Sequence, residues 1–367
     1  MTHINWCGYY SDNDGYGRFN SRMIWALRNA GVQVSYFTKY HLGMPGWMQK
    51  ELGIDWNDLT ISCAPAVELA KVPGKHWLIT MIESNCVDHD WLVHLCTKDL
   101  ERILVPCLEN RNAFENAGVN IPIEILHGGT DPKEFPWVEG DGNRPYTFLA
   151  LTDRGFRKGW SEVWEAFYKA FGGKTTGIQD VRLILKYLPH TALKETMSAM
   201  SGADGADKRI IYQSESAKSM WDVFYQVDCV VLPSHFEGWG MPHREAAMAG
   251  LPVITQKYSG MDDGFTEKWA LTVPGREMTL GWWQIPDIDA IAEKMKWCFY
   301  NREEASRFGK SASLWLQENQ TWDHSAARLL EMMEEQGYAA SSKMEVERPS
   351  RRMVEAGFAR NLHPQSL

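Results

Sequence analysis

Short apolar runs recur along most of the chain and are separated by polar loops and amphipathic segments. Val227–Leu232 and Tyr146–Leu151 are nearly continuous in apolar side chains, which is typical of strands buried on both faces of a parallel sheet. Similar runs occupy 4–9, 32–36, 77–84, 102–106, 123–126, 181–186, 209–212 and 252–255. Between the first two of these, apolar residues from Phe19 to Ala30 recur at helical spacing, and Gly31 suits the end of a helix. Strands that alternate with helices predict an α/β fold with parallel sheets.

The length of the chain and one polar segment predict two domains. With 367 residues and 44% hydrophobic content, the chain can form two cores of ordinary size. The segment 139–145 is rich in glycine, proline and polar residues, as linkers are. We therefore expect Rossmann-like domains over residues 1–140 and 141–335, followed by a polar tail or a short returning helix over residues 336–367.

Composition narrows the function classes. The formal net charge of −9 gives no general basic footprint for nucleic acid or anionic lipid. The seven cysteines are scattered without a C-x-x-C pair, which favours a reducing compartment and argues against structural zinc. No apolar run approaches the roughly 20 residues of a membrane span, and residues 1–6 lack a basic region followed by an apolar stretch. We therefore expect a soluble, cytoplasmic protein.

The segment from Pro233 to Glu245 carries the strongest chemical signal. Glu237 and Glu245 lie eight positions apart, with two glycines and a proline between them. The apolar run before this loop predicts a strand, while Pro242 suits the first turn of a following helix. In an open parallel sheet, ligands bind at such a loop, where the N–H groups of the helix attract phosphate or hydroxyl groups. Each carboxylate can accept a pair of hydroxyl groups, which fits a nucleotide-sugar with its ribose and its hexose.

This segment resembles the E-x7-E region of the family 4 (GT4-like) glycosyltransferases, which have the GT-B fold. The family usually reads E-G-F/Y-G-L/M-P-x-x-E-A-M-A-x-G-x-P-V-I/V, and here Trp239 replaces the usual aromatic residue while Ala247 lies beside the expected small residues. The resemblance covers roughly residues 4–330. It implies an α/β fold of two Rossmann-like domains facing a central cleft, and transfer of a sugar with retention of anomeric configuration.

A basic turn follows one of the predicted strands. The turn from Thr152 to Trp160 resembles the family's G-R-L-x-x-x-K-G turn, whose Arg and Lys hold the donor diphosphate. The resemblance implies that Lys158 takes this role together with Arg154, or with Arg157 because Arg154 lies one residue closer to the lysine than is usual. Fixed cations suit a nucleoside diphosphate leaving group, because they stabilise its developing negative charge without a metal. The alternative is a solvated basic turn.

The resemblance also implies roles for the Glu pair and for residues near it. Glu237 would contact the donor sugar, and Glu245 would contact the ribose. The loop 213–216, with Ser214, matches the place where the family holds the base. The backbone that lines the sugar would come from Gly238, Trp239, Gly240 and Met241.

The first half of the chain offers acceptor-side candidates. Gly15 and Gly17 follow the first strand, where the family has a glycine loop that faces the diphosphate and the acceptor, although a plain turn is an equal alternative. The run 77–84 predicts a strand that ends near Glu83, and the resemblance places a catalytic His or acidic residue at this strand end. A carboxylate there can orient or deprotonate the acceptor hydroxyl. His89 is the second candidate, although a lone histidine is more often structural.

Three D-x-D triplets require comparison with GT-A glycosyltransferases, which chelate a divalent metal with such a pair. They are Asp12-Asn13-Asp14, Asp88-His89-Asp90 and Asp287-Ile288-Asp289. None follows a strand in the required way, and Asp287 suits the N-cap of a helix. We therefore expect no essential metal, and no cofactor besides a UDP- or GDP-linked sugar as co-substrate.

The sequence thus predicts a glycosyltransferase that moves a hexose from a nucleoside diphosphate sugar to an acceptor hydroxyl. The main alternative is a nucleotide-sugar or carbohydrate-binding protein without turnover. A dinucleotide-dependent dehydrogenase or epimerase is disfavoured, because the glycine loop lacks G-x-G-x-x-G and the second strand lacks an acidic residue at its end. The acceptor stays open among a glycan, a lipid, a protein and a modified nucleic-acid base. The segment 39–47 mixes cations with aromatic residues that can contact a membrane surface, although ordinary packing is favoured.

Overall fold

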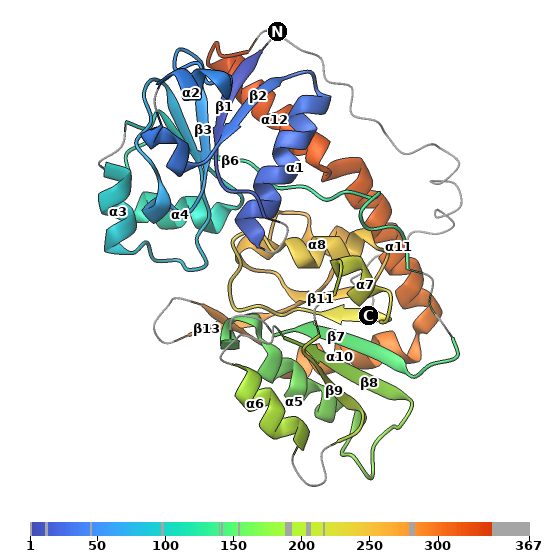
Figure 1. Ribbon diagram of the computed structural model, residues 1–367. Coiled ribbons are helices and arrows are strands. Elements are labelled where there is room, and N and C mark those ends of the chain that lie inside the picture. The colour runs from blue at the N-terminus through green and yellow to red at the C-terminus, as the bar shows by residue number, and fades with distance from the viewer. Residues whose placement is uncertain are drawn as a thin grey trace. The chain divides into compact units, whose positions relative to one another are not determined.

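The computed structural model describes residues 2–11, 14–44, 46–96, 99–138, 140, 142–152, 155–187, 193–202, 207–215, 217–278 and 283–339. These residues form two compact units (Figure 1). The first contains the residues up to Gly129 together with those from Gln320 onward, and the second extends from Thr130 to Asn319. The sequence predicts a boundary at residue 140 and places residues up to 335 in the second domain. The structure instead groups residues 320–335 with the first unit. The predicted tail lies outside the described residues from position 340 onward.

The first unit is built on a sheet of six parallel strands in the order β2-β1-β3-β4-β5-β6. The strands are β1 (His3–Cys7), β2 (Gln33–Phe37), β3 (Thr60–Cys63), β4 (His76–Ile79), β5 (Arg102–Val105) and β6 (Ile123–Ile125). The helices are α1 (Gly15–Asn29), α2 (Gly46–Glu51), α3 (His89–Cys96), α4 (Leu108–Asn116) and α12 (Trp322–Glu335), with the 3-10 turns η1 (Lys39–Gly43) and η2 (Ala66–Glu68).

Helix α1 shows how local sequence and packing agree in this unit. Asp14 caps the helix, because its side chain accepts a hydrogen bond from the backbone N–H of Gly17. The apolar face is fully buried, and Gly31 follows the helix with a φ of 82°. Phe19 on this face meets the ring of Trp322 edge-on, with ring centroids 5.2 Å apart. A helix from the far end of the chain is therefore part of the first core.

The second unit contains another six-stranded parallel sheet, in the order β12-β11-β10-β7-β8-β9. Its strands are β7 (Tyr146–Leu151), β8 (Val181–Lys186), β9 (Ile210–Gln213), β10 (Cys229–Val231), β11 (Val253–Gln256) and β12 (Leu271–Val273), and β13 (Gly275–Glu277) pairs with β14 (Gln284–Pro286) in a separate hairpin. The helices are α5 (Trp160–Phe171), α6 (Leu193–Gly202), α7 (Met220–Phe224), α8 (Met241–Met248), α9 (Thr266–Trp269), α10 (Ile288–Tyr300) and α11 (Arg302–Asn319), with η3 (Gly155–Lys158) and η4 (Ser259–Met261).

Two apolar clusters cover the opposite faces of this second sheet. Phe148 of β7 packs in the cluster that includes α5 and α10, whereas its neighbour Leu149 packs in the cluster that includes α8 and α11. Successive residues of a strand point to opposite faces, so β7 is buried on both sides. This burial explains why its sequence is apolar except for Thr147.

The structure confirms the predicted α/β class and the parallel sheets. The predicted limits of β7 and β8 coincide with the observed ones, and Asp287 caps α10 as expected. Two predictions for the first unit need correction. The strand predicted over 77–84 ends at Ile79, and β3, which pairs with β1 and β4, is not among the predicted strands. Within the described residues, no helix is both long and apolar enough to cross a membrane.

Candidate active site

The candidate site lies in the second unit, at the point where the order of the strands in the sheet reverses. β7 is the first strand of this sheet, and it pairs with β8 on one side and with β10 on the other. The loops that follow β7 and β10 therefore start side by side at the carboxyl edge. In open α/β sheets this switch point is the place where ligands bind.

Glu237, in the loop after β10, is the centre of this site. Its carboxylate is buried, and one oxygen lies 2.6 Å from the Nζ of Lys158 in the loop after β7. The other oxygen lies 3.2 Å from the guanidinium of Arg157, which also donates a hydrogen bond to the carbonyl oxygen of Phe236. Two predicted motifs, far apart in sequence, thus meet through a double ion pair.

The ion pairs determine the charge state of the carboxyl group. Burial by itself raises the pKa of Glu237, but the positive charges of Lys158 and Arg157 outweigh it and lower the pKa well below its ordinary value. The carboxylate is therefore ionised at neutral pH. It can act as a fixed negative charge or as a hydrogen-bond acceptor.

His243, in the first turn of α8, is a neutral neighbour of this carboxylate. Burial is the largest effect on its imidazole and lowers its pKa to about 4, although the charge of Glu237 acts in the opposite direction. Its Nε2 lies 2.8 Å from the carbonyl oxygen of Leu232. Because a carbonyl oxygen only accepts, Nε2 carries the proton and donates a hydrogen bond to it. The ring therefore ties the start of α8 to the end of β10.

Backbone hydrogen bonds join the three loops around Glu237. The N–H of Glu237 donates to the Oγ of Ser259, and the N–H of Gly260 donates to the carbonyl oxygen of Glu237. The N–H of His235 donates to the carbonyl oxygen of Arg157. The backbone that carries the charged side chains is thus fixed from both neighbouring loops.

Two glycines permit this close packing. Gly159 has a φ of 67°, and a Cβ there would lie 2.5 Å from the carbonyl oxygen of Pro233. A Cβ on Gly260 would lie 2.5 Å from the backbone of Gly238. Gly240, with a φ of 72°, forms the N-cap of α8, and Pro242 lies in its first turn. The loop after β10 thus packs closely against Gly260 and leads through Gly240 into the start of α8.

The other donor-side candidates lie at the same edge of the second unit. Glu245 is buried one turn into α8, and Ser214 is half-buried directly after β9. The predicted sugar-lining segment from Gly238 to Met241 forms the loop end and the first residue of α8. Arg154 lies outside the described residues, so the described cations beside Glu237 are Arg157 and Lys158.

The acceptor-side candidates lie in the first unit. Gly15 and Gly17 are part of the first turn of α1 rather than of a loop, and a Cβ on Gly17 would lie 2.6 Å from the backbone of Ser11. Glu83 is exposed, and β4 ends four residues before it, so it does not occupy the strand end that the sequence predicts. His89 is exposed at the first position of α3.

The segment before Glu83 is nevertheless firmly held. The side chain of Asn110 accepts a hydrogen bond from the N–H of Ile82 and donates one to its carbonyl oxygen. The hydroxyl of Tyr16 likewise bonds both the N–H and the carbonyl oxygen of Met81. Glu83 therefore extends from a fixed backbone, because α1 and α4 hold the residues that precede it.

The structure describes two of the D-x-D triplets in full. Asp88 and Asp90 are exposed near the start of α3, whereas Asp287 caps α10 and Asp289 pairs with Lys169 at 2.8 Å. Asp12 and Asn13 lie outside the described residues. Across the described part of the chain, no three His, Cys, Asp or Glu side chains gather in a way that could hold a metal ion.

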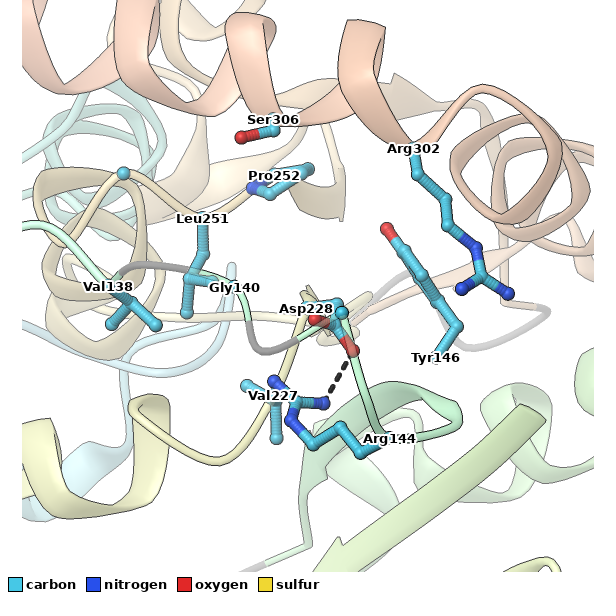
Figure 2. Close-up of a pocket in the computed structure, with 12 residues that line it drawn as sticks. Val138, Gly140, Arg144, Tyr146, Val227, Asp228, Leu251, Pro252, Arg302 and Ser306 are labelled. Carbon is cyan, nitrogen blue, oxygen red and sulfur yellow. Dashed lines mark hydrogen bonds and ion pairs between the residues drawn. The ribbon is translucent and has the colours of Figure 1, made fainter. Parts of the chain in front are cut away.

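A hollow of about 170 Å³ lies away from this site, at the amino-terminal ends of β7 and β10 (Figure 2). Arg144, Tyr146, Asp228 and Arg302 line it, and Arg144 pairs with Asp228 at 2.6 Å. Burial raises the pKa of Asp228 despite this partner. The hollow does not include Glu237 or the cations that pair with it.

Sequence reasoning missed His243, Arg244 and Ser259 as residues of this site. The signal for Arg244 was present, because a charged residue that directly precedes Glu245 and the small apolar residues of α8 requires a partner if it is buried. The sequence does not indicate the special position of Ser259, because its left-handed backbone conformation, with a φ of 52°, is visible only in the structure.

Comparison with known proteins gives one family match and several structures of similar fold. Residues 190–315 match the family of group 1 glycosyl transferases, a stretch that contains both Glu237 and Glu245. The structure resembles a sucrose-phosphate synthase from Thermosynechococcus elongatus with a TM-score of 0.68 and 14% identity, over 93% of this chain and 100% of that one. It resembles Anabaena HepE in complex with UDP and glucose with a TM-score of 0.65 and 13% identity, over 91% and 100%.

The chain has the GT-B fold. A glycosyltransferase from Rickettsia africae gives a TM-score of 0.66 at 11% identity, over 91% of this chain and 98% of that one. No curated protein sequence matches the chain significantly. The family match lies within the second unit, and the solved structures show the GT-B fold. Arg157 and Lys158 lie outside the matched residues, and the fold brings them to Glu237.

The close approach of Gly159 to Pro233 can be tested with two alanine substitutions in one loop. Gly155 and Gly159 both have positive φ, but a Cβ on Gly155 would meet nothing within 4 Å. We expect Gly155→Ala to cost about 1–2 kcal/mol of stability from backbone strain alone. We expect Gly159→Ala to cost roughly 3 kcal/mol, because the backbone of Pro233 must also move. Urea denaturation of the two variants measures both values, and equal losses would contradict the proposed contact.

The low pKa of His243 predicts a pH-dependent contribution to stability. Its folded-state pKa of about 4 lies below the ordinary value of 6.5, so the unfolded chain binds a proton first as the pH falls. The contribution is complete above pH 6.5 and decreases between that value and pH 4. Between pH 7.5 and 5.5, wild type should lose about 1 kcal/mol more than His243→Gln, which still offers a donor to Leu232. Parallel acid slopes of the two proteins in denaturant titrations would contradict this assignment.

Proposed function

We propose that the protein is a metal-independent glycosyltransferase that moves a hexose from a nucleoside diphosphate sugar to an acceptor hydroxyl with retention of configuration. The observation that carries this proposal is the buried pairing of Glu237 with Lys158 and Arg157 at the switch point of the second sheet. This arrangement places two cations and a carboxylate beside the N-terminus of α8, where a diphosphate and a sugar can bind together.

The cations would serve the leaving group. When the bond between the anomeric carbon and the phosphate oxygen breaks, the electron pair stays on the nucleoside diphosphate. Lys158 and Arg157 can shift their ion-pair contacts from Glu237 to the diphosphate, because a phosphate oxygen is a strong acceptor for both side chains. Fixed cations in a partly buried site stabilise this charge better than water does.

The carboxylates and the helix N-terminus would hold the sugar and the ribose. In this proposal Glu237 accepts hydrogen bonds from hydroxyl groups of the hexose, and Glu245 accepts them from the ribose. Backbone N–H groups from Gly238 to Met241 would line the same space, and Ser214, directly after β9, would lie beside the base. The N–H groups at the start of α8 favour a negatively charged phosphate.

The acceptor hydroxyl would attack the anomeric carbon on the face that the leaving group vacates, which gives retention. Its proton passes to a phosphate oxygen of the leaving group or to a carboxylate base, and we propose Glu83 for the acceptor side. The acceptor is a hydroxyl of a glycan, a lipid, a protein or a modified base. A cytoplasmic location remains an expectation from the cysteine pattern.

The donor identifies the function most directly. The HepE structures contain UDP with glucose in one case and UDP-glucose in another, so UDP-glucose is the first donor to test. We expect one sugar nucleotide from a panel of UDP-, GDP- and ADP-linked sugars to raise the melting temperature and to be slowly hydrolysed, with EDTA present or absent. Stabilisation without hydrolysis would instead indicate a binding protein, and no response to any donor would contradict nucleotide-sugar use.

Substitution of the ion pair tests which side chains act. We expect Glu237→Gln to lower kcat at least about 100-fold, and Lys158→Met to weaken nucleoside diphosphate affinity about tenfold, because each removes one contact to the donor. Lys257→Met is the matched control, since Lys257 is an exposed cation that pairs with Glu267 at 2.7 Å. Full activity in Glu237→Gln with an unchanged circular dichroism spectrum would refute the assigned role.

Retention is tested on the free sugar that slow hydrolysis of the donor releases. Proton NMR, recorded before this sugar mutarotates, should show the same anomer as in the donor.

A further inference from the structure

Arg244 is a fully buried cation on α8, one residue before Glu245. It pairs with the carboxylate of Asp263 at 3.0 Å, and both side chains are completely shielded from solvent. The guanidinium also lies over two indole rings, 3.6 Å from the ring centroid of Trp239 and 4.6 Å from that of Trp269. A charge in such a place requires a reason beyond packing, because burying it is costly.

The hydrogen bonds of Arg244 show which backbone it serves. One terminal nitrogen, Nη1, donates to the carbonyl oxygens of both Trp239 and Gly260, the second at 2.9 Å. Nη2 donates to Asp263, which also accepts hydrogen bonds from the indole of Trp269 and from the N–H of Phe265. The guanidinium therefore joins the loop after β10 to the loop after β11.

The residues that carry these two carbonyl groups lie close to Glu237, which pairs with Lys158 and Arg157. Trp239 lies two residues after Glu237, while the N–H of Gly260 bonds the carbonyl oxygen of Glu237 itself. The neighbouring Ser259 accepts a hydrogen bond from the N–H of Glu237 in a left-handed backbone conformation, with a φ of 52°. Such a conformation persists only where the surroundings determine it.

Trp239 also has a different role from the one that its position suggests. Its ring is only 2% exposed and stacks on the guanidinium, so its flat face is not available to a sugar. The aromatic residue of this loop is thus part of the support of the loop.

We propose that Arg244 is a positioning residue, which sets the backbone of the Glu237 loop for donor binding by bridging the carbonyl groups of Trp239 and Gly260. This inference rests on the proposed function for its effect on activity. Its structural part, the fixing of the loop, does not depend on the donor.

Two variants separate the bridge from the ion pair. Arg244→Lys keeps a positive charge against Asp263, but an ammonium group cannot reproduce the planar donors that reach two carbonyl groups and a carboxylate together. Asp263→Asn keeps the guanidinium and its bonds to the two carbonyl groups, but removes the ion pair. Both changes disturb the same buried network, so a purely structural role predicts similar effects.

For the positioning role we expect different effects. Arg244→Lys should lower kcat/KM about 10- to 100-fold, because a small displacement of Glu237 impairs a preorganised site. The kcat/KM of Asp263→Asn should stay within about threefold of the wild-type value per folded molecule, even if its melting temperature falls as much as that of Arg244→Lys. Arg302→Lys is the control, since Arg302 forms an exposed ion pair with Asp180 at 3.0 Å.

Backbone hydrogen exchange of a peptide that covers residues 233–241 supplies a readout that needs no donor. Exchange should be faster in Arg244→Lys and unchanged in Asp263→Asn and in Arg302→Lys. Equal exchange in all variants, or an equal loss of activity in Arg244→Lys and Asp263→Asn, would overturn the positioning role. A wild-type protein that binds and hydrolyses no nucleotide-sugar would instead refute the proposed function, and the exchange data would still decide the role of Arg244.

Discussion

The buried carboxylate of Glu237 is the constraint on which the candidate site depends. An ionised carboxylate away from water is stable only if charged partners and hydrogen bonds replace its hydration. Lys158 and Arg157 supply that compensation from the loop after β7. The two loops must therefore approach closely, and Gly159 beside Pro233 allows the approach, since no larger residue fits that backbone. One electrostatic requirement thus explains the loop packing and a glycine position.

The sequence predicted the elements whose residues agree locally with their burial. β7 and β8 are buried on both sides of a sheet, so their apolar runs mark their limits. The Glu237 to Glu245 segment was recognisable because turn glycines, a helix-starting proline and two carboxylates follow one another within a few residues. Each of these signals depends on neighbours in sequence, and the structure contains β7, β8, β10 and α8 at these places.

The misses depend on partners that are distant in sequence. β3 alternates the polar residues Thr60 and Ser62 with apolar ones, so it lacks the continuous apolar run that marks β7, yet both polar residues are buried. Ser62 bonds His76 of the neighbouring β4 at 2.7 Å, and Thr60 accepts a hydrogen bond from Asn5 of β1. Their polar groups are satisfied only by the assembled sheet. The placement of α12 in the first unit depends in the same way on Trp322 and Phe19, at opposite ends of the chain.

The choice of arginine at position 244 follows from the carbonyl groups rather than from the carboxylate. A buried pair of opposite charges is often no more stable than apolar residues of the same volume. An apolar residue here would leave the carbonyl oxygens of Trp239 and Gly260 without this donor inside the protein, which is costly for each group. A guanidinium donates to both through Nη1 and still has Nη2 for the carboxylate of Asp263. Asp263 then balances the charge that this geometry brings into the core, so the ion pair is a consequence of how the loop is held.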